Sequence, residues 1–142
     1  MPWACISRSN LKKCPIGKFD INKIVKYYGK WIESHPFDIG NTIRKSIISC
    51  HSNNPQAYIV RKKAAEGNQT SQSNGSLMRI TPLAVYLHKI TDVELFSKLA
   101  IEEIMLTHID PTVQIAGVAY CLAIASLIRL KGDRKQALEI VK

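Results

Sequence analysis

The 142-residue chain is long enough for one domain with its own hydrophobic core and too short for two ordinary domains. Hydrophobic residues make up 46% of it and charged residues 22%, which is typical of a soluble globular protein and excludes a disordered chain. The net charge of +9 comes entirely from residues 1–65, which hold 12 basic and 3 acidic side chains, because residues 66–142 hold 8 of each. A basic half favours a polyanionic partner, such as nucleic acid, an acidic membrane or a phosphorylated ligand.

The spacing of hydrophobic residues predicts a helix that begins after Asp20, its N-cap, and ends at His35-Pro36. Its apolar stripe consists of Ile21, Ile24, Val25, Tyr28, Trp31 and Ile32. A short second helix follows, capped by Asn41 or Thr42, with Ile43, Ile47 and Ile48 on its apolar face. Asn54-Pro55 and Gly67 mark the start and the end of a third helix. Residues 67–75 are polar and predict a surface loop.

The second half of the chain continues with helical patterns. A helix is predicted from Ser76 to about Leu87, kinked or ended by Pro82. The capping box of Thr91 and Glu94 opens the next helix, which runs to about Leu106 and turns Phe96, Leu99, Ala100 and Ile104 inward. Asp110-Pro111 opens an apolar helix closed by Gly132, and Asp133 starts a last one. No alternating apolar and polar run is present in the sequence, so we expect an all-α fold.

Two features of the sequence bear on cellular location. The cysteines Cys5, Cys14, Cys50 and Cys121 form no metal-binding or paired spacing, and the N-terminus lacks a signal-peptide pattern. Both observations favour reduced thiols in an intracellular, cytoplasmic protein. Residues 111–128 lack charge and approach the length of a membrane span, but their alanines and the Asp110-Pro111 start favour a buried helix and no membrane partner.

Three loops that lead into helices are candidates for ligand binding. Ser73-Asn74-Gly75-Ser76 presents backbone N–H groups at the positive end of a helix dipole, with Arg79 one turn further on, which is the arrangement of a phosphate cradle. An ordinary cap on a flexible loop is the alternative. Two other helix starts have similar loops: Thr107-His108 before the helix that Asp110-Pro111 opens, and Gly40-Asn41-Thr42 at the start of the short second helix. Together the three loops are consistent with a pyrophosphate-containing ligand.

The same segments resemble the successive signatures of the ADP-ribosylglycohydrolase family. The matching stretches are residues 36–42, residues 73–79 with Pro82-Leu83, and residues 106–111, within a resemblance that spans roughly residues 19–135. The resemblance implies an orthogonal helical bundle with two magnesium ions, which hydrolyses the bond between ADP-ribose and a protein side chain or small acceptor. It implies ligand contacts for Gly40, Asn41, Thr42, Ser73, Asn74, Gly75, Ser76 and His108, and no catalytic role for Arg79.

One departure from the family pattern concerns the metal. The family binds its ions through a Thr-Asp-Asp segment and an Asp-x-Asp-Thr segment, whereas the aspartates here are isolated: Asp20, Asp38, Asp92, Asp110 and Asp133. Glu102 and Glu103 cannot substitute, because adjacent residues of a helix point in different directions. We therefore expect residues 1–142 to form one partial domain that is inactive alone. No residue is assigned a catalytic or metal-binding role.

Two other functions remain open on the sequence. A non-catalytic module that binds ADP-ribose or a nucleotide would retain the same loops. No nucleic-acid-binding motif accompanies the basic residues, which disfavours a small basic helical domain that binds nucleic acid. Such a domain would use Lys12-Lys13, Lys18, Lys23, Lys26, Lys30 and Arg61-Lys62-Lys63. Because the helix over residues 113–128 is apolar around most of its circumference, we also expect exposed apolar surface and self-association.

Overall fold

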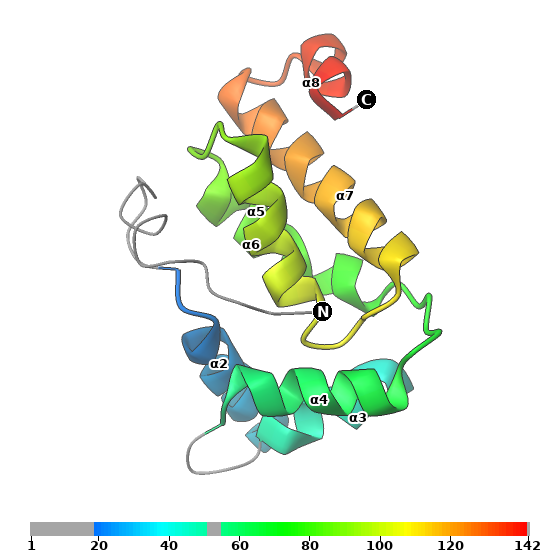
Figure 1. Ribbon diagram of the computed structural model, residues 1–142. Helices are drawn as coiled ribbons and strands as arrows, with labels where there is room; N and C mark the ends of the chain where they lie inside the picture. Colours follow the sequence, from blue (N-terminus) through cyan, green and yellow to red (C-terminus); the bar gives the residue numbers. More distant parts are fainter. Residues whose placement is uncertain (1–18, 51–54, 142) are drawn as a thin grey trace.

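The computed structural model describes residues 19–50 and 55–141. The elements are all helical in these ranges and confirm the all-α fold (Figure 1). In chain order they are α2 (Ile21–Glu33), α3 (Asn41–Ile47), the 3-10 turn η1 (Ile48–Cys50), α4 (Ala57–Gly67), α5 (Gly75–Leu87), α6 (Val93–Ile104), α7 (Pro111–Arg129) and α8 (Arg134–Val141).

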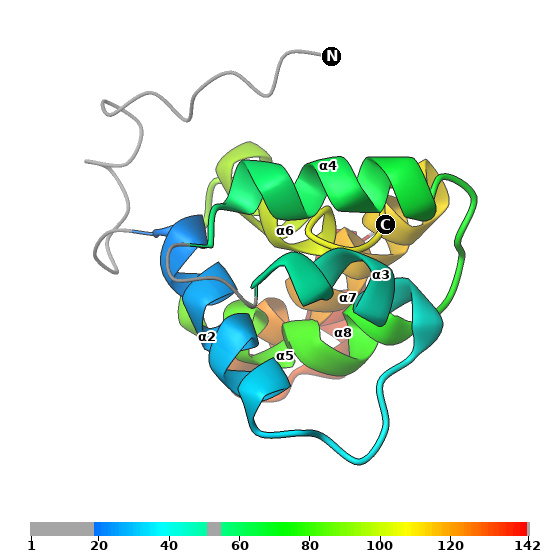
Figure 2. The same cartoon turned by 90° about the horizontal axis from the view of Figure 1, so that it is seen from below.

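The helices form two groups, each with its own hydrophobic core. Helices α2, α3 and α4 lie together at one end of the molecule, as Figure 2 shows from below, and enclose a small core. Helices α5, α6 and α7 enclose a larger one, against which α8 packs. The small core contains Val25, Ile47, Cys50, Ala57, Val60 and Leu106. The closest helix packing is all within one group or the other. Side chains hold the seam between the groups, among them Ile21 and Ile24 of α2, which pack against both cores.

Aspartate caps set three helix starts as predicted. The Asp20 carboxylate accepts hydrogen bonds from the amides of Asn22 and Lys23, at 3.1 and 3.3 Å, and begins α2. Asp110 accepts from the Thr112 amide at 2.8 Å and begins α7, with Pro111 as the first helical residue. Asp133 does the same for α8. These predictions succeed because a cap requires only the two or three residues that follow it.

Two predicted caps are wrong. The N-cap of α3 is Gly40. Asn41 and Thr42, the predicted caps, both lie inside the first turn of the helix. Asp92 replaces Thr91 as the cap of α6 and accepts from the Leu95 amide at 3.0 Å. Aspartate and threonine both suit a cap, and the carboxylate carries the charge that favours a helix N-terminus.

Other boundaries also differ from the prediction. Helix α5 runs through Pro82 without a break, because the buried residues on its inner face hold it against α6 and α7 while Pro82 lies exposed. Helix α4 begins at Ala57, two residues after Pro55, and Asn54 lies outside the described residues. Gly67 and Gly75 belong to the flanking helices, so the connecting loop covers residues 68–74. Ile48 is exposed and does not join the core of its group.

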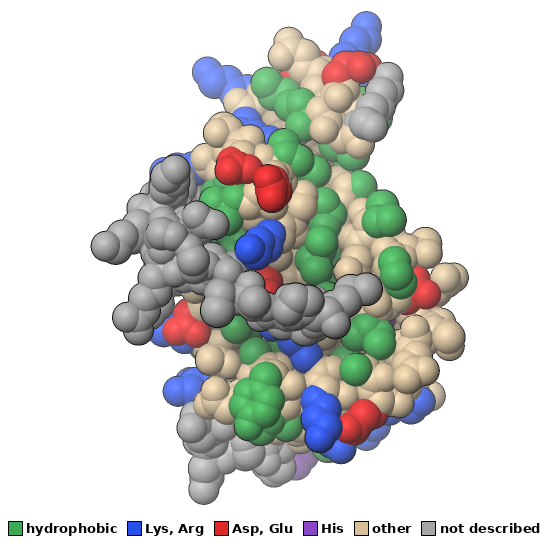
Figure 3. Space-filling model, in the orientation of Figure 1, with side chains coloured by type: hydrophobic (Ala, Val, Ile, Leu, Met, Phe, Trp, Pro, Cys, Tyr) green, Lys and Arg blue, Asp and Glu red, His purple; other side chains and the backbone are tan. Residues whose placement is uncertain are grey.

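Helix α7 is only partly covered by the rest of the protein. It packs against α5, α6 and α8, yet Ile115, Tyr120 and Ile128 are exposed, and Figure 3 shows apolar side chains along the side where α7 runs. Among the described residues it is the one helix long and apolar enough to cross a membrane, with 33% of its apolar window buried. Core helices of soluble proteins have the same length and composition, so this finding is weak evidence for a membrane span.

The contact between α2 and η1 gives the first testable prediction. A methyl group on Gly29 would lie 2.7 Å from the Cys50 carbonyl oxygen, a backbone atom that cannot rotate away. We expect Gly29→Ala to lower the free energy of unfolding by about 1–2 kcal/mol, because the overlap outweighs the helix propensity that alanine adds. Gly67→Ala is the control, since its nearest neighbour is the Lys45 side chain at 3.4 Å. Chemical denaturation compares the two, and equal stability would contradict the prediction.

Candidate functional site

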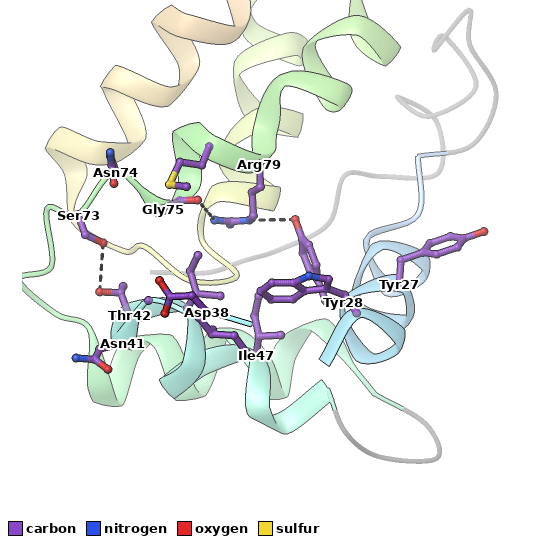
Figure 4. A pocket seen from close by; sticks show the side chains of 15 residues that line it. Tyr27, Tyr28, Asp38, Asn41, Thr42, Ile47, Ser73, Asn74, Gly75 and Arg79 are labelled. Atoms are coloured by element: carbon purple, nitrogen blue, oxygen red, sulfur yellow. Dashed lines mark hydrogen bonds between the residues drawn. The ribbon is translucent and has the colours of Figure 1, made fainter. Parts of the chain in front are cut away.

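A cavity of about 820 Å³ lies at the seam between the two helical groups (Figure 4). One wall comes from α2, the loop before α3 and α3 itself, and the other from the loop before α5 and the first turns of α5. Six of the eight predicted ligand residues line it: Gly40, Asn41, Thr42, Ser73, Asn74 and Gly75. The structure therefore brings together two predicted loops that are about thirty residues apart in the chain.

Hydroxyl groups join these two loops. The Ser73 hydroxyl donates to Thr42 Oγ1 at 3.2 Å, and Thr42 Oγ1 lies 2.8 Å from Ser71 Oγ. Beneath them the buried Asn68 side chain donates from Nδ2 to the carbonyl oxygens of Thr42 and Thr107, at 2.8 and 3.0 Å. Asn68 therefore ties the start of α3 to the turn after α6, and the two sides of the cavity are held in register.

The start of α5 leaves backbone donors at the cavity. Asn74 is the N-cap, but its side chain makes no capping hydrogen bond, so the first amides of the helix have no acceptor from that residue. Gly75 packs closely: a methyl group there would lie 2.9 Å from Ile43 Cδ1 and 3.3 Å from His108 Cε1. Glycine at this position lets α5 begin directly against α3, which brings the positive end of its dipole to the cavity wall.

The other two predicted residues lie behind this wall. His108 is fully buried, and its Nε2 is 2.9 Å from Ser73 Oγ while its Nδ1 is 2.7 Å from Thr107 Oγ1. Ser76 is also fully buried, and its hydroxyl has no hydrogen-bond partner in the described structure. Neither lines the cavity, so His108 reaches it through Ser73. Their contact with a ligand stays a prediction.

A buried ion pair closes the inner end of the cavity. Arg79 Nε on α5 donates to Glu103 Oε1 on α6 at 2.9 Å and to the Tyr28 hydroxyl on α2 at 3.0 Å. Tyr28 in turn donates to Glu103 Oε1. Burial, followed by the charge of Glu103, raises the pKa of Tyr28, so the phenol stays protonated. Glu102 points elsewhere, to Arg61 on α4, which confirms that the two adjacent glutamates do not converge.

The structure adds residues to the site that the sequence analysis did not assign. Asp38 lines the cavity and is the one carboxylate among the described residues that do so. Tyr28 and Trp31 also line it, although their helical spacing had placed them on the core-facing stripe of α2. Asp38 could have been found, because it lies two residues before Gly40 in a segment already assigned to the ligand. The aromatic pair could not, since core and cavity residues share one helical face.

The carboxylates do not fit a two-magnesium centre. Magnesium takes six oxygen ligands in octahedral geometry, of which the protein usually supplies one or two carboxylates per ion, so a centre with two ions needs several carboxylates close together. Within residues 19–50 and 55–141 no group of three or more His, Cys, Asp or Glu side chains gathers. We therefore derive no chemical step through a metal.

The buried histidine gives a prediction about pH. Burial first, and then the charge of Arg79, lowers the pKa of His108 to about 4, whereas the unfolded chain titrates near 6.5. As pH falls, the unfolded state binds a proton at His108 before the folded state does. The contribution of neutral His108 to the free energy of unfolding is therefore full above pH 6.5 and is lost toward pH 4. We expect a loss of about 3 kcal/mol between pH 7 and pH 4 that His108→Gln does not show. Denaturation across pH measures it, and parallel curves would contradict it.

Comparison with known proteins identifies one family. The family model described as ADP-ribosylglycohydrolase matches residues 4–142. A protein of Acanthamoeba polyphaga mimivirus, named as a candidate ADP-ribosyl glycohydrolase, is 31% identical over 110 residues, which cover 75% of this chain and 32% of the viral protein. The chain thus matches about a third of the length of that curated relative. No solved structure matches significantly. The match over nearly the whole sequence places the chain in the ADP-ribosylglycohydrolase family.

Proposed function

We propose that this chain binds ADP-ribose in the seam cavity and forms the ligand-holding part of an ADP-ribosyl glycohydrolase. The observation that carries the proposal is the convergence of the Gly40–Thr42 and Ser73–Gly75 segments on one cavity in a chain of this family. Backbone amides at the start of α5 would hold a diphosphate, since a helix N-terminus favours anions. The Ser73 and Thr42 hydroxyls would add hydrogen bonds, and Asp38 would accept from sugar hydroxyls.

The chemical step is a separate matter. Hydrolysis of a glycosidic bond uses a pair of carboxyl groups or metal ions that organise the attacking water. Among the described residues that line the cavity, Asp38 is the one carboxylate. The carboxylates of the described residues form no metal-binding cluster. In the family the metal ions, which we expect to be magnesium, supply this chemistry. We propose that the 142 residues alone bind the ligand with little or no hydrolysis, as a non-catalytic ADP-ribose module would.

The cysteines and the basic residues bear on cellular location and on a nucleic-acid partner. Cys50 and Cys121 lie in separate cores as free thiols, which is consistent with the reducing intracellular location that we propose. A nucleic-acid partner is disfavoured further, because Arg61 of the basic set is engaged by Glu102. Lys23, Lys26 and Lys30 are exposed on α2, and Lys12, Lys13 and Lys18 lie outside the described residues.

Calorimetric titration with ADP-ribose tests ligand binding. We expect Asn74→Ala to weaken binding about tenfold, because it removes one polar contact to a charged ligand and no hydrogen bond that the protein itself needs. Gln69→Ala is the matched control, since Gln69 lies exposed in the same loop and does not line the cavity. Absence of heat with the parent chain would overturn the proposal. Strong magnesium-dependent release of ADP-ribose from ADP-ribosyl-arginine or ADP-ribosyl-serine would instead overturn the proposed lack of activity.

We also propose that the exposed side of α7 drives self-association. Ile115 is 70% exposed on an apolar helix, and Tyr58 on α4 is exposed to the same extent. In sedimentation runs we expect the parent chain to associate as its concentration rises, and Ile115→Lys to move the equilibrium toward monomer. Tyr58→Lys, which places the same charge on the other helical group, should leave it unchanged. A parent chain that stays monomeric would show that this surface does not associate.

A further inference from the structure

The inner wall of the seam cavity is also the wall of a second cavity. That second cavity, of about 320 Å³, lies on the side of Phe19, Lys23 and Tyr86. Tyr28 and Arg79 line both cavities, and Glu103 lines the second. The Tyr28–Arg79–Glu103 cluster is therefore a thin partition with space on both sides, and hydrogen bonds within the cluster hold it in place.

Arg79 makes more contacts than an ion pair requires. Besides Glu103 Oε1 and Tyr28, it donates from Nη1 to the Gly75 carbonyl oxygen at 3.2 Å and from Nη2 to the Glu103 carbonyl oxygen at 3.3 Å. The guanidinium thus joins the first turn of α5 to the last turn of α6 and, through the Tyr28 hydroxyl, to α2. The planar fork of arginine allows these simultaneous bonds, which a lysine ammonium in one position cannot reproduce.

The cluster crosses the seam where helix packing is weakest. Its three residues come from both helical groups, Tyr28 from one and Arg79 and Glu103 from the other. The Arg79 and Glu103 side chains are 13% and 4% exposed, so removal of one charge leaves the other buried without compensation. In Figure 4 the bonds from Arg79 run in one direction to Gly75 and in the other to Tyr28.

We propose that Arg79, Glu103 and Tyr28 are positioning residues that set the distance and orientation between the α5 cradle and the α2 wall of the seam cavity. The cluster acts on a ligand through Gly75, whose carbonyl it holds, and so orients the neighbouring amides of Gly75 and Ser76. This inference rests on the proposed ADP-ribose binding for its ligand, but the geometric role itself does not depend on a ligand.

The adjacent glutamates provide a matched experiment. Glu103→Gln removes the charge that holds Arg79. Glu102→Gln removes the charge that holds Arg61 on α4, in a pair that does not line the seam cavity and whose glutamate side chain is 17% exposed against 4% for Glu103. Thermal unfolding of both variants measures the cost to stability. Titration with ADP-ribose should then show about tenfold weaker binding for Glu103→Gln and less than twofold for Glu102→Gln. Arg79→Lys retains the positive charge but lacks the planar fork, so this variant should also bind ADP-ribose more weakly than the parent chain.

A second readout separates this inference from the proposed function. In amide NMR spectra without ligand, we expect the Gly75, Ser76 and Leu77 signals to move in Glu103→Gln and to stay in place in Glu102→Gln. If the parent chain binds no ADP-ribose, the proposed function fails and these signals still decide the positioning role. Equal spectra at Gly75–Leu77 for the two variants would overturn it. If Glu103→Gln does not fold, Tyr28→Phe, which keeps the ion pair, should move the same signals.

Discussion

The hydrogen-bonded pair of Arg79 and Glu103 is the constraint on which the arrangement of this protein depends. A charge buried at this depth requires an opposite charge and hydrogen-bond donors, which Arg79 and Tyr28 supply at Glu103 Oε1, so the three helices that carry these residues must stay at fixed distances. The two helical groups enclose two hydrophobic cores, which Ile21 and Ile24 of α2 both contact, and touch little through their backbones. Apolar packing stabilises each group and continues across the seam at Ile21 and Ile24 of α2, and the polar cluster adds directional contacts that orient the two groups.

This division of roles explains why a cavity persists at the seam. Asn68 joins backbone groups at one side of it, and the Arg79 cluster joins helices at its inner end. Hydrogen bonds have preferred directions and lengths. Apolar contacts are non-directional and favour burial of as much apolar surface as possible. A seam joined by hydrogen bonds can therefore keep about 820 Å³ open between two packed cores.

The parts of the fold that could be predicted from sequence are those set by neighbouring residues. Asp20, Asp110 and Asp133 begin helices because each cap is completed within three residues. The site was only partly predictable. The loops at Gly40–Thr42 and Ser73–Gly75 have local signatures, but Tyr28 and Glu103 are 75 residues apart and meet only in the folded chain. Glu103 lies in an amphipathic helix where its partner could not be inferred, and the spacing of Trp31 is equally that of a core residue.

The two buried cysteines have a consequence for how the protein opens. Cys50 belongs to the core of α2, α3 and α4, and Cys121 to the core of α5, α6 and α7. Burial raises the pKa of both thiols to about 12, and for Cys121 the charge of Glu103 adds to this, so neither forms the reactive thiolate while its core is closed. Each helical group thus contains its own chemical reporter. A thiol reagent modifies Cys50 and Cys121 at equal rates when the whole chain unfolds, so a difference between the two rates measures how much more often one group exposes its interior than the other.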